Sequence, residues 1–556
     1  MEQLIFIADI IPTNDPLMLP NSLPRVAYFC MEYALQSDFK LYAGGLGILA
    51  GDYLKGARDH KFPIVGIGIK WKQGYTDQRI SPEGKAIDTY PIYEYPFLKD
   101  TGKTVSVTIR KRDVKCKIWV CDKFKNAPLY LLDTDVPGNE DGWISGQLYG
   151  WFGEERIAQE MVLGIGGVKA LRALKIPVDV YHFNEGHALF AGFELMREKV
   201  KNGKSFDQAL AATRKQIVFT THTPVVQGNE SHYIDRLMYM GADNGVFNKQ
   251  QLKKLGGSPF NMTVGALRLS RKSNAVAQLH AVTANKMWVD VKDRDEIIGI
   301  TNAIHIPTWV DKRIIVEAKS SSNKIWHLHQ ENKKQLIDFI YKRTGTKLKQ
   351  DALLIGFSRR AVPYKRSDLI FRDRSKIDKL FRRGKLQIVF SGKAHPLDDG
   401  GKKIVANIVA LTKKYPQSVV FLENYDMTIG SMLVRGSDIW LNNPRRPQEA
   451  SGTSGMKAAM NGVLNLSILD GWWPEACQHG DNGWQIGDGY ENKNEAKLDE
   501  HDQKALYKVL LNEVVPTYYK HKNQWVQMMK LSVLTTHKQF AVKRMLDEYY
   551  QLLYKE

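Results

Sequence analysis

The chain has 556 residues, of which 43% are hydrophobic and 25% are charged, and its formal net charge at pH 7 is +19. This length predicts two large domains rather than one core, and the hydrophobic content excludes a disordered chain. The lysines are scattered and are not interleaved with aromatic residues. The charge therefore does not favour nucleic-acid binding, and we interpret it as a general compositional bias.

Apolar, β-rich runs alternate with amphipathic segments along the chain. In the first half the pattern predicts strands over Val26–Phe29, Ile64–Ile69, Val178–Phe183 and Ile217–Thr220, and helices over Ile48–His60 and Glu154–Leu174. In the second half it predicts strands over Leu353–Phe357, Leu386–Phe390 and Val419–Leu422, each of which runs into a polar motif. Strand, polar loop and helix in repetition are typical of open parallel α/β sheets, which bind ligands outside the carboxyl ends of their strands.

The two sets of strands are separated by a polar, lysine-rich stretch near Lys312–Lys349, and Glu500–Glu556 is helical by pattern. We therefore expect an α/β protein with two Rossmann-like domains whose parallel sheets face a central cleft, the GT-B fold. The expected limits are 1–315 for the N-terminal domain, 316–530 for the C-terminal domain and 531–556 for a last helix.

The cysteines and the N-terminus bear on location. Cys116 and Cys121 are separated by four residues, with no second pair or histidine near them, so we expect free thiols in a reducing cytoplasm. Glu2 and Asp9 occupy the N-terminus, which lacks the basic and apolar regions of a signal peptide. No apolar stretch approaches the roughly 20 residues that a membrane helix needs. We expect a cytoplasmic protein that binds neither a membrane nor nucleic acid.

The most informative motif is Glu449–Lys457, in which Lys457 follows a turn rich in glycine, serine and threonine. A lysine amine can attack an aldehyde, and the N–H and hydroxyl groups of such a turn can hold a phosphate. Pyridoxal phosphate carries both groups. Glycine-rich turns with a lysine are common, so an ordinary exposed lysine is the alternative interpretation.

Two further motifs are suited to anions. Gly44–Gly47 precedes a predicted helix, so bare backbone N–H groups and the positive helix end could bind an anion, although a tight turn explains it equally well. Arg359, Arg360, Lys365 and Arg366 place four cations within eight residues after an apolar strand. Such a cluster is costly unless anions neutralise it, and a solvated basic face is the alternative.

Several polar side chains are suited to sugar hydroxyls, because carboxylates and amides can exchange two hydrogen bonds in one plane. The candidates are Glu449, Ser451 with the Gly452 backbone, Asn302 and His222. His222 follows a buried strand and is alternatively a packed structural residue, while Glu185 and His187 either line the cleft or cap the next helix. A glycosidase needs two carboxylates astride the bond, and Glu449 is the one acidic residue that can be placed there, so hydrolysis is disfavoured.

Together these motifs resemble, in the same order, those of the α-glucan (glycogen/starch/maltodextrin) phosphorylase family. The resemblance extends over roughly residues 25–490. Its blocks are Gly44–Gly47, Asn184–His187, Thr220–Pro224, Thr301-Asn302, Arg359-Arg360 with Tyr364–Arg366, Glu423–Tyr425, and Glu449–Lys457 continuing through Asn461 to Leu469–Gly471.

The resemblance implies a GT-B enzyme of a short bacterial type, which would convert an α-1,4-glucan and orthophosphate reversibly into glucose 1-phosphate and a shorter glucan. It implies that the first domain holds the sugar, that the second holds pyridoxal phosphate and the reacting phosphate, and that the last helix packs back on the first. The implied catalytic residues are Lys457, which anchors the cofactor, Arg360 and Lys365, which bind phosphate, and His222, whose carbonyl faces the anomeric carbon. The implied cofactor-binding residues are Arg359, Thr453, Gly452, Trp309, Tyr425 and Gly44, and the implied substrate-binding residues are Gly45, Asn302, Tyr364, Glu449, Ser451, Gly452 and His187.

The family's reaction, as the resemblance implies it, needs no carboxyl acid. The cofactor phosphate lies against the substrate phosphate, which protonates the glycosidic oxygen and then accepts the glucosyl group with retention of configuration.

Two departures from the family keep alternatives open. Asp426 stands where the large members have an arginine near the cofactor phosphate, and Ala34 stands where many have a tyrosine. The animal enzymes' phosphorylation segment, nucleotide-effector site and gating loop have no counterpart that we can identify. A nucleotide-sugar-dependent glucan synthase of the same fold and a catalytically silent glucan-binding protein are the alternatives, and a homodimer is the assembly considered.

Overall fold

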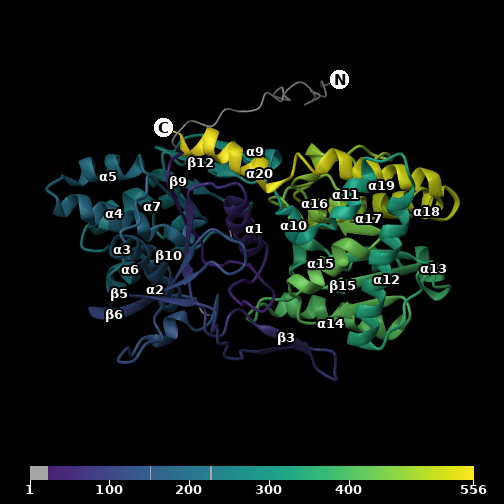
Figure 1. Ribbon diagram of the computed structural model, residues 1–556, viewed down its shortest axis with the longest axis horizontal. Coiled ribbons are helices and arrows are strands. Elements are labelled where there is room, and N and C mark those ends of the chain that lie inside the picture. Colours follow the sequence, from purple (N-terminus) through teal and green to yellow (C-terminus); the bar gives the residue numbers. More distant parts are fainter. Residues whose placement is uncertain (1–22, 151, 226–227, 556) are drawn as a thin grey trace.

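The computed structural model describes residues 23–150, 152–225 and 228–555. Two lobes lie side by side, and each is built around one sheet (Figure 1). Glu2 and Asp9, on which the expected lack of a signal peptide depends, lie outside the described residues. Within the described ranges, none of the helices combines the length and the apolar character that crossing a membrane requires.

The first lobe contains a nine-stranded sheet in the order β13-β12-β9-β8-β1-β2-β7-β6-β5. Its strands from β13 to β7 are parallel, and β6 and β5 extend it as an antiparallel edge. The bounds are β1 Val26–Phe29, β2 Ile64–Ile69, β5 Lys99–Ile109, β6 Arg112–Cys121, β7 Leu129–Asp133, β8 Val180–Asn184, β9 Ile217–Thr220, β12 Lys272–Ala275 and β13 Ile297–Gly299. Three of the four predicted strands have their predicted bounds, and the fourth, β8, begins two residues late.

The second lobe contains a fully parallel six-stranded sheet in the order β16-β15-β14-β17-β18-β19. The bounds are β14 Leu353–Ser358, β15 Leu386–Ser391, β16 Val419–Leu422, β17 Ile439–Asn442, β18 Leu464–Ile468 and β19 Gly483–Ile486. All three strands predicted here are confirmed, and two of them run one serine further. Two facing sheets with helices packed around them make this a GT-B fold, as predicted.

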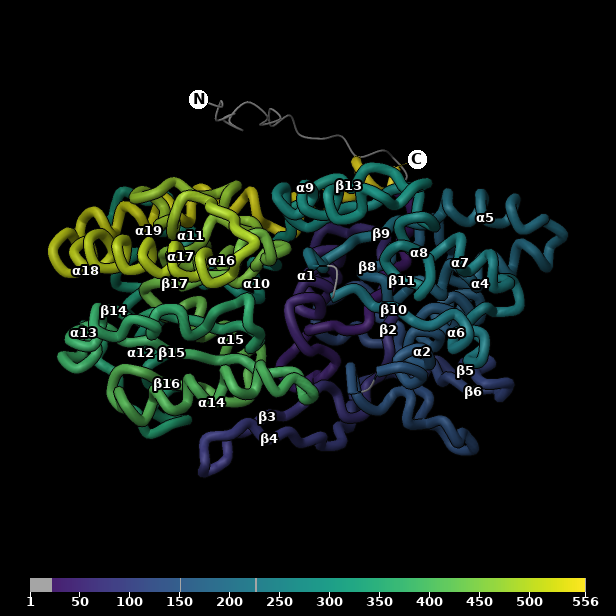
Figure 2. Tube along the Cα trace, turned by 180° about the vertical axis from the view of Figure 1, so that it is seen from behind, coloured from purple at the N-terminus to yellow at the C-terminus, as the bar shows by residue number. Residues whose placement is uncertain are grey.

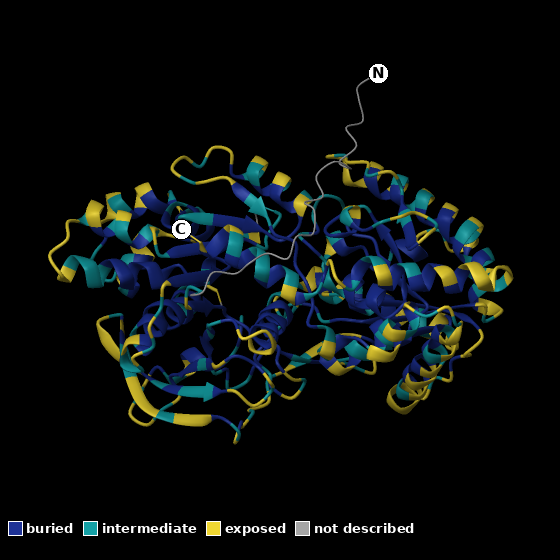
Figure 3. Ribbon diagram, turned by 45° about the horizontal axis from the view of Figure 1, so that its top comes forward, coloured by how far each residue is buried: buried dark blue, intermediate teal, exposed yellow. Residues whose placement is uncertain are grey.

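Helices cover both sheets, with buried faces toward the strands and exposed faces outward (Figure 3). Those of the first lobe are α1 Gly45–Asp59, α2 Glu154–Met161, α3 Gly167–Ala173, α4 Phe190–Lys201, α5 Phe206–Arg214, α6 Ile234–Met240, α7 Lys249–Gly256, α8 Met262–Leu269 and α9 Gln278–Met287. They are followed by α10 Ile306–Trp309, α11 Lys312–Ala318, α12 Lys324–Thr344, α13 Asp378–Arg382, α14 Asp399–Lys414, α15 Met427–Gly436, α16 Thr453–Met460, α17 Glu495–Val509, α18 Val515–Lys520, α19 Lys522–Thr536 and α20 Val542–Glu548. The predicted helix over Glu154–Leu174 is interrupted by a π-helical turn at Val162–Gly166, and α1 begins three residues before the predicted Ile48.

The chain crosses between the lobes more than once. α11 packs on α19, and its Ile314 and Ala318 belong to the apolar core of the second sheet. α20 lies over the first lobe (Figure 1), where Val542 and Leu546 pack against Gly56 of α1. The domain limits at 315/316 and 530/531 stay predictions.

A hairpin of the first lobe reaches under the second lobe (Figure 2). It consists of β3 (Asp77–Ile80) and β4 (Ala86–Thr89). The Gln78 side chain exchanges two hydrogen bonds with the backbone of Ala394, at 2.9 and 3.1 Å, and the Ile80 N–H donates to Glu423 at 2.7 Å. Because these groups are largely shielded from water, the hairpin holds the two sheets at a fixed separation.

Candidate active site

The predicted site residues lie where each sheet reverses its strand order. The chain enters the first sheet at β1, adds β2 on one side and β8 on the other; in the second sheet it enters at β14 and adds β15 and β17 on opposite sides. Parallel α/β sheets bind ligands at such switch points, outside the carboxyl ends of the strands. The loops after β1 and β8 carry Gly44–Gly47 and His187, those after β9 and β13 carry His222 and Asn302, and those after β14 and β17 carry the cationic and lysine motifs.

Lys457 is buried, although its motif alone also allowed an exposed lysine. Its side chain lies on α16, and its Nζ is 3.5 Å from the centroid of the Trp309 ring. The Trp309 indole N–H donates to both carboxylate oxygens of Asp52, at 2.9 and 2.8 Å. Burial lowers the pKa of Lys457 to about 8, although Asp52 opposes the shift. An amine with this pKa is substantially neutral near pH 7 to 8, the form that attacks an aldehyde.

Arg359 and Lys365 both contact Glu449, a pairing that the sequence did not predict. Arg359 Nη2 and Lys365 Nζ each lie 2.5 Å from Glu449 Oε2, and Arg359 also donates to Asn442. The three side chains are between 6% and 9% exposed. The cluster has two cations on one carboxylate, so a positive charge remains in a nearly dry place, which favours a further anion.

A second carboxylate lies beside Glu449. Burial raises the pKa of Glu449, but Arg359 and Lys365 outweigh burial, and the net pKa is lowered. Asp470 accepts the backbone N–H of Glu449 at 2.9 Å and is fully buried. Burial, and next the Glu449 charge, raise the pKa of Asp470 to about 7. Asp470 therefore fixes the backbone of Glu449 and carries a proton part of the time near neutrality.

Arg360 and Tyr364 flank this cluster in different ways. The Arg360 side chain is exposed and has no ion pair with any residue in the described ranges, so it is free to meet an anion from solvent. Tyr364 lies beneath the neighbouring lysine, with Lys365 Nζ 4.7 Å from its ring centroid. The cation–π contact restricts where the lysine can point.

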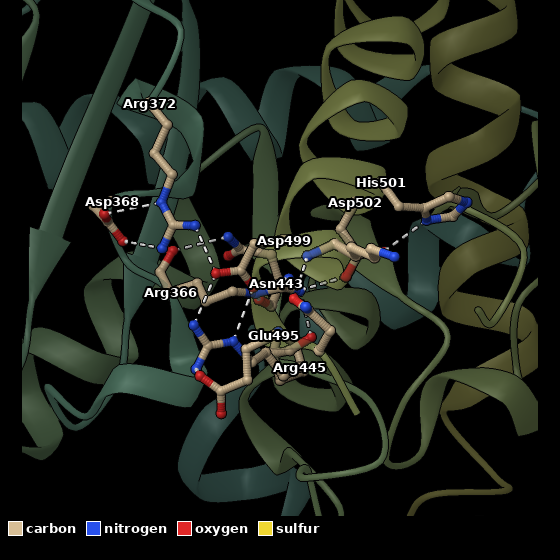
Figure 4. A network of polar contacts seen from close by, with 12 residues as sticks. Arg366, Asp368, Arg372, Asn443, Arg445, Glu495, Asp499, His501 and Asp502 are labelled. Carbon is tan, nitrogen blue, oxygen red and sulfur yellow. Dashed lines mark hydrogen bonds and ion pairs between the residues drawn. The ribbon is translucent and has the colours of Figure 1, made fainter. Parts of the chain in front are cut away.

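Arg366 does not belong to the anion site. Its fully buried guanidinium donates to Asp499 at 2.9 Å and to Asp502 at 2.8 Å (Figure 4). Asp499 also accepts from Arg372 and Arg445. The fourth cation of the motif is thus neutralised by carboxylates of α17. Because Arg366 follows Lys365 and Arg445 precedes Glu449 in the chain, this network holds the two loops of the cluster against one another.

The start of α1 leaves open space at two predicted glycines. A Cβ added at Gly44 or Gly45 would meet nothing within 4 Å, whereas one at Gly47 would lie 2.7 Å from Glu32 Oε2. The Gly44 N–H donates to the same Glu32 oxygen at 3.0 Å. One N–H of the turn is therefore taken by a carboxylate, and the open face at Gly44 and Gly45 is what a ligand could approach.

Three predicted sugar-binding residues carry buried polar atoms that have no hydrogen-bond partner among the residues that the structure describes. These atoms are Ser451 Oγ, Asn302 Oδ1 and His187 Nδ1. Burial lowers the pKa of His187 to about 4, so its ring is neutral at pH 7. Buried polar groups are rarely left unpaired, and sugar hydroxyls can both donate to and accept from such atoms.

His222 makes the contacts of a packed structural residue, and its place beside the sugar stays a prediction. Its Nε2 hydrogen-bonds to Asn184 Oδ1 at 2.6 Å, and its backbone N–H donates to Glu185 at 2.9 Å. Burial lowers the pKa of His222 to about 3, so the ring is neutral. Glu185 also accepts the N–H of Gly186, which makes it the helix cap considered from sequence.

The departures from the family have local explanations. Asp426 caps α15 by accepting the Ile429 N–H at 2.8 Å, a role that an arginine could not fill. The preceding Tyr425 lines a small pocket between the lobes together with Tyr42 and Ala43. Ala34 is fully buried, and its carbonyl is so close to α1 that a Cβ on Gly51 would lie 2.0 Å from it.

The turn that precedes Lys457 has the conformation that its glycine allows. Gly452 has φ +87°, and it caps α16, whose first residue is Thr453. Both residues are only partly buried, so their backbone and hydroxyl groups remain accessible beside the buried amine.

Sequence reasoning missed two residues of the site, Asp52 and Asn442, and it gave no role to Asp470, which lies in a quoted motif. Asn442 ends the apolar strand β17 and Asp470 follows β18, so the pattern of a strand running into a polar group could have identified both. Asp52 lies on α1 among apolar neighbours, where a buried carboxylate signals a partner but does not reveal that it is Trp309.

The comparisons with known proteins agree with this geometry. The sequence model of the family described as carbohydrate phosphorylase matches residues 310–509. Maltodextrin phosphorylase of Thermococcus litoralis is 37% identical over 96% of this chain and 70% of that protein, and glycogen phosphorylase of Aquifex aeolicus is 36% identical over 96% and 86%. An uncharacterized protein of Methanocaldococcus jannaschii is 37% identical over 95% of this chain and 99% of its own length.

A GT-B fold with a buried lysine and a cation cluster at facing switch points defines a glycosyltransferase-like protein. The fold, the site and the extended similarity to the maltodextrin and glycogen phosphorylases together identify the family of this chain. The chain belongs to the carbohydrate phosphorylase family.

Proposed function

We propose that the protein is an α-1,4-glucan phosphorylase, which transfers a terminal glucosyl group of a glucan to orthophosphate and forms glucose 1-phosphate reversibly. The observation that carries the proposal is the Arg359–Glu449–Lys365 cluster, a nearly dry site with excess positive charge beside unpaired sugar-binding atoms. An anion acceptor and a sugar donor would meet there.

The residues around Lys457 fit pyridoxal phosphate. The amine is buried, its pKa is lowered to about 8, and it lies over the Trp309 ring, while a Cβ at Gly44 or Gly45 would meet nothing within 4 Å. Lys457 would hold the cofactor covalently, with Thr453 and Arg359 near its phosphate. When bound, the cofactor supplies a second phosphate group, which can exchange a proton with the reacting phosphate.

Groups of this chain would bind the phosphate, bind the sugar and stabilise the charge that develops during the reaction. Arg360 and Lys365 bind and orient the reacting phosphate, and Tyr364 restricts the lysine. Glu449, Ser451, Asn302 and His187 bind hydroxyls of the sugar. The neutral His222 presents its backbone carbonyl to the anomeric carbon, where a partial negative charge stabilises the positive charge that develops. The proposed reaction requires no carboxyl acid.

A glucan chain, orthophosphate and glucose 1-phosphate are the proposed reactants. Three buried cysteines and the part-buried Cys477 are all free thiols, in keeping with the expected cytoplasmic location, which stays a prediction. The homodimer also stays a prediction.

The test separates phosphorolysis from synthesis. The purified protein is incubated with maltodextrin and either phosphate or a nucleotide-glucose donor, each with and without pyridoxal phosphate. We expect glucose 1-phosphate from phosphate alone, dependent on the cofactor. Chain extension from the nucleotide donor without product from phosphate would favour the synthase, and inactivity in both would favour a glucan-binding protein.

A further inference from the structure

Glu449 holds a position that the proposed reaction needs for phosphate. Both nearby cations contact one of its oxygens, Oε2, at 2.5 Å. Its other oxygen, Oε1, has no hydrogen bond to any group in the described part of the chain. One side chain thus bridges the two cations and still has a free oxygen, and among the described residues the buried Ser451 Oγ of the same loop has no hydrogen-bond partner.

We propose that Glu449 is an internal anion, which the reacting phosphate displaces from Lys365 and which then accepts sugar hydroxyls, so that phosphate and sugar bind cooperatively. The inference rests on the proposed function, because it concerns phosphate and sugar in the same site.

The exchange follows from charge and hydrogen-bonding capacity. A phosphate dianion carries twice the charge of a carboxylate and offers more acceptor oxygens, so with Arg360 as a second donor it binds Lys365 more strongly than Glu449 does. Once displaced, a nearly dry carboxylate needs new donors, because a buried unpaired charge is costly. Hydroxyl groups of a sugar are such donors, and phosphate therefore prepares the sugar site.

The backbone allows this exchange without a wider rearrangement. Asp470 holds the Glu449 N–H at 2.9 Å, and the Arg366–Asp499 network ties down the loops on both sides. Glu449 can therefore move between phosphate-binding cations and sugar by rotating its side chain. Coupling between two ligands is reciprocal, so the sugar must strengthen phosphate binding by the same factor as phosphate strengthens sugar binding.

The first experiment measures this factor in the wild-type holoenzyme. The Kd of inorganic phosphate is determined by calorimetry with and without 1,5-anhydroglucitol, a glucose analogue without an anomeric hydroxyl, which cannot react. We expect the sugar to lower the phosphate Kd about tenfold, within the range usual for coupled sites. Equal phosphate Kd values with and without bound sugar would overturn the proposal, as would a wild-type protein that binds no phosphate.

The second experiment removes the internal anion. Glu449→Gln keeps the size of the side chain and its capacity for hydroxyls but does not neutralise the cations. We expect it to bind phosphate about tenfold more tightly than the wild type without sugar, and the sugar to have no further effect. Ser451→Ala is the matched control, since it removes a sugar contact from the same loop and should leave the sugar-free phosphate Kd unchanged. A wild-type phosphate Kd in Glu449→Gln would overturn the proposal.

A third measurement guards against a variant that folds poorly. Because Glu449→Gln leaves the buried Lys365 without its carboxylate, its Tm should fall without phosphate and should rise more with phosphate than the Tm of the wild type. An equal or smaller rise would contradict the proposal. Failure of the proposed function has a different signature: phosphate and sugar could bind cooperatively while maltodextrin and phosphate gave no glucose 1-phosphate.

Discussion

The amine of Lys457 lies 3.5 Å from the centre of the Trp309 ring. The tryptophan comes from α10 and the lysine from α16, and Met456, beside the lysine, shares an apolar cluster with Ala34 of the first lobe. The ring attracts the charged form of the amine, while burial disfavours that form more strongly. The Trp309 ring therefore orients the Lys457 side chain, while burial lowers the pKa of its amine and so makes the amine more reactive.

Lys457→Ala should abolish cofactor binding. The substitution removes the one amine over the Trp309 ring, so protein incubated with pyridoxal phosphate and then dialysed should lack the cofactor's near-ultraviolet absorbance. Lys504→Ala is the control, because Lys504 is an exposed lysine on α17 paired only with Glu500. An unchanged spectrum in Lys457→Ala would refute the assignment of the anchoring lysine.

Asp470 should make stability decrease as the pH rises. Its pKa is raised to about 7 in the folded chain, whereas an unfolded aspartate titrates near 4. Between these values the folded state holds the proton and the unfolded state does not, so this contribution falls from about pH 4 to about pH 7 and then levels off. At about 1.4 kcal/mol per pKa unit, the change amounts to a few kcal/mol.

The measurement is the difference in unfolding free energy between wild type and Asp470→Asn across that pH range. An asparagine cannot accept from Glu449 and Gly471 through both of its side-chain atoms, so the variant should be less stable by roughly 1–3 kcal/mol at low pH. The difference in unfolding free energy between wild type and Asp470→Asn should shrink as the pH rises. A gap independent of pH would show that Asp470 does not hold the proton.

Much of the architecture could be predicted because apolar strands end abruptly in polar motifs. Ile217–Thr220 and Val419–Leu422 have the predicted bounds for this reason. The β5–β6 hairpin was missed because much of β5, such as Lys99–Lys103, is polar and exposed and presents no apolar run. The alternation of Val105, Val107 and Ile109 with polar residues is the signal that could have identified the strand.

The site was harder to predict where ion pairs join residues that are far apart in the sequence. The sequence showed four clustered cations but could not show that Arg366 meets Asp499, which lies 133 residues away. It assigned Glu449 to sugar hydroxyls, which stays a prediction, and it could not show that Glu449 also pairs with Arg359 and Lys365. Charge alone does not select among distant carboxylates, because that choice depends on which loops the sheets bring together.

Asp499→Asn should destabilise the second lobe and weaken phosphate use. Burial favours the neutral acid, but hydrogen bonds from Arg445, Arg372 and Arg366 lower the pKa of Asp499 well below its usual value. Its stabilisation is therefore present above about pH 4 and lost as the pH falls through the folded pKa. Losing one partner of a buried pair costs roughly 3–5 kcal/mol.

Denaturant unfolding and the KM for phosphate measure the two effects. We expect the KM to rise more than kcat falls, because the network positions Lys365 without contacting substrate. Glu495→Gln is the matched control, since it breaks an exposed ion pair with the same Arg445 and should cost at most about 1 kcal/mol. A destabilised Asp499→Asn with an unchanged KM would limit the network to a structural role.

Arg360→Ala should weaken the use of phosphate and of glucose 1-phosphate together. Arg360 follows Arg359 in the loop after β14, yet within the described ranges it is exposed and has no ion pair. A charge-assisted hydrogen bond is worth about 1.5–3 kcal/mol, which corresponds to a 10- to 100-fold loss in kcat/KM. Because both substrates present the same phosphate, the losses in the two directions should agree. Arg383→Ala, which removes an exposed arginine after α13, should leave both values within twofold. Normal phosphate dependence in Arg360→Ala would mean that this arginine belongs to a solvated basic face and that Lys365 and Arg359 bind the phosphate without it.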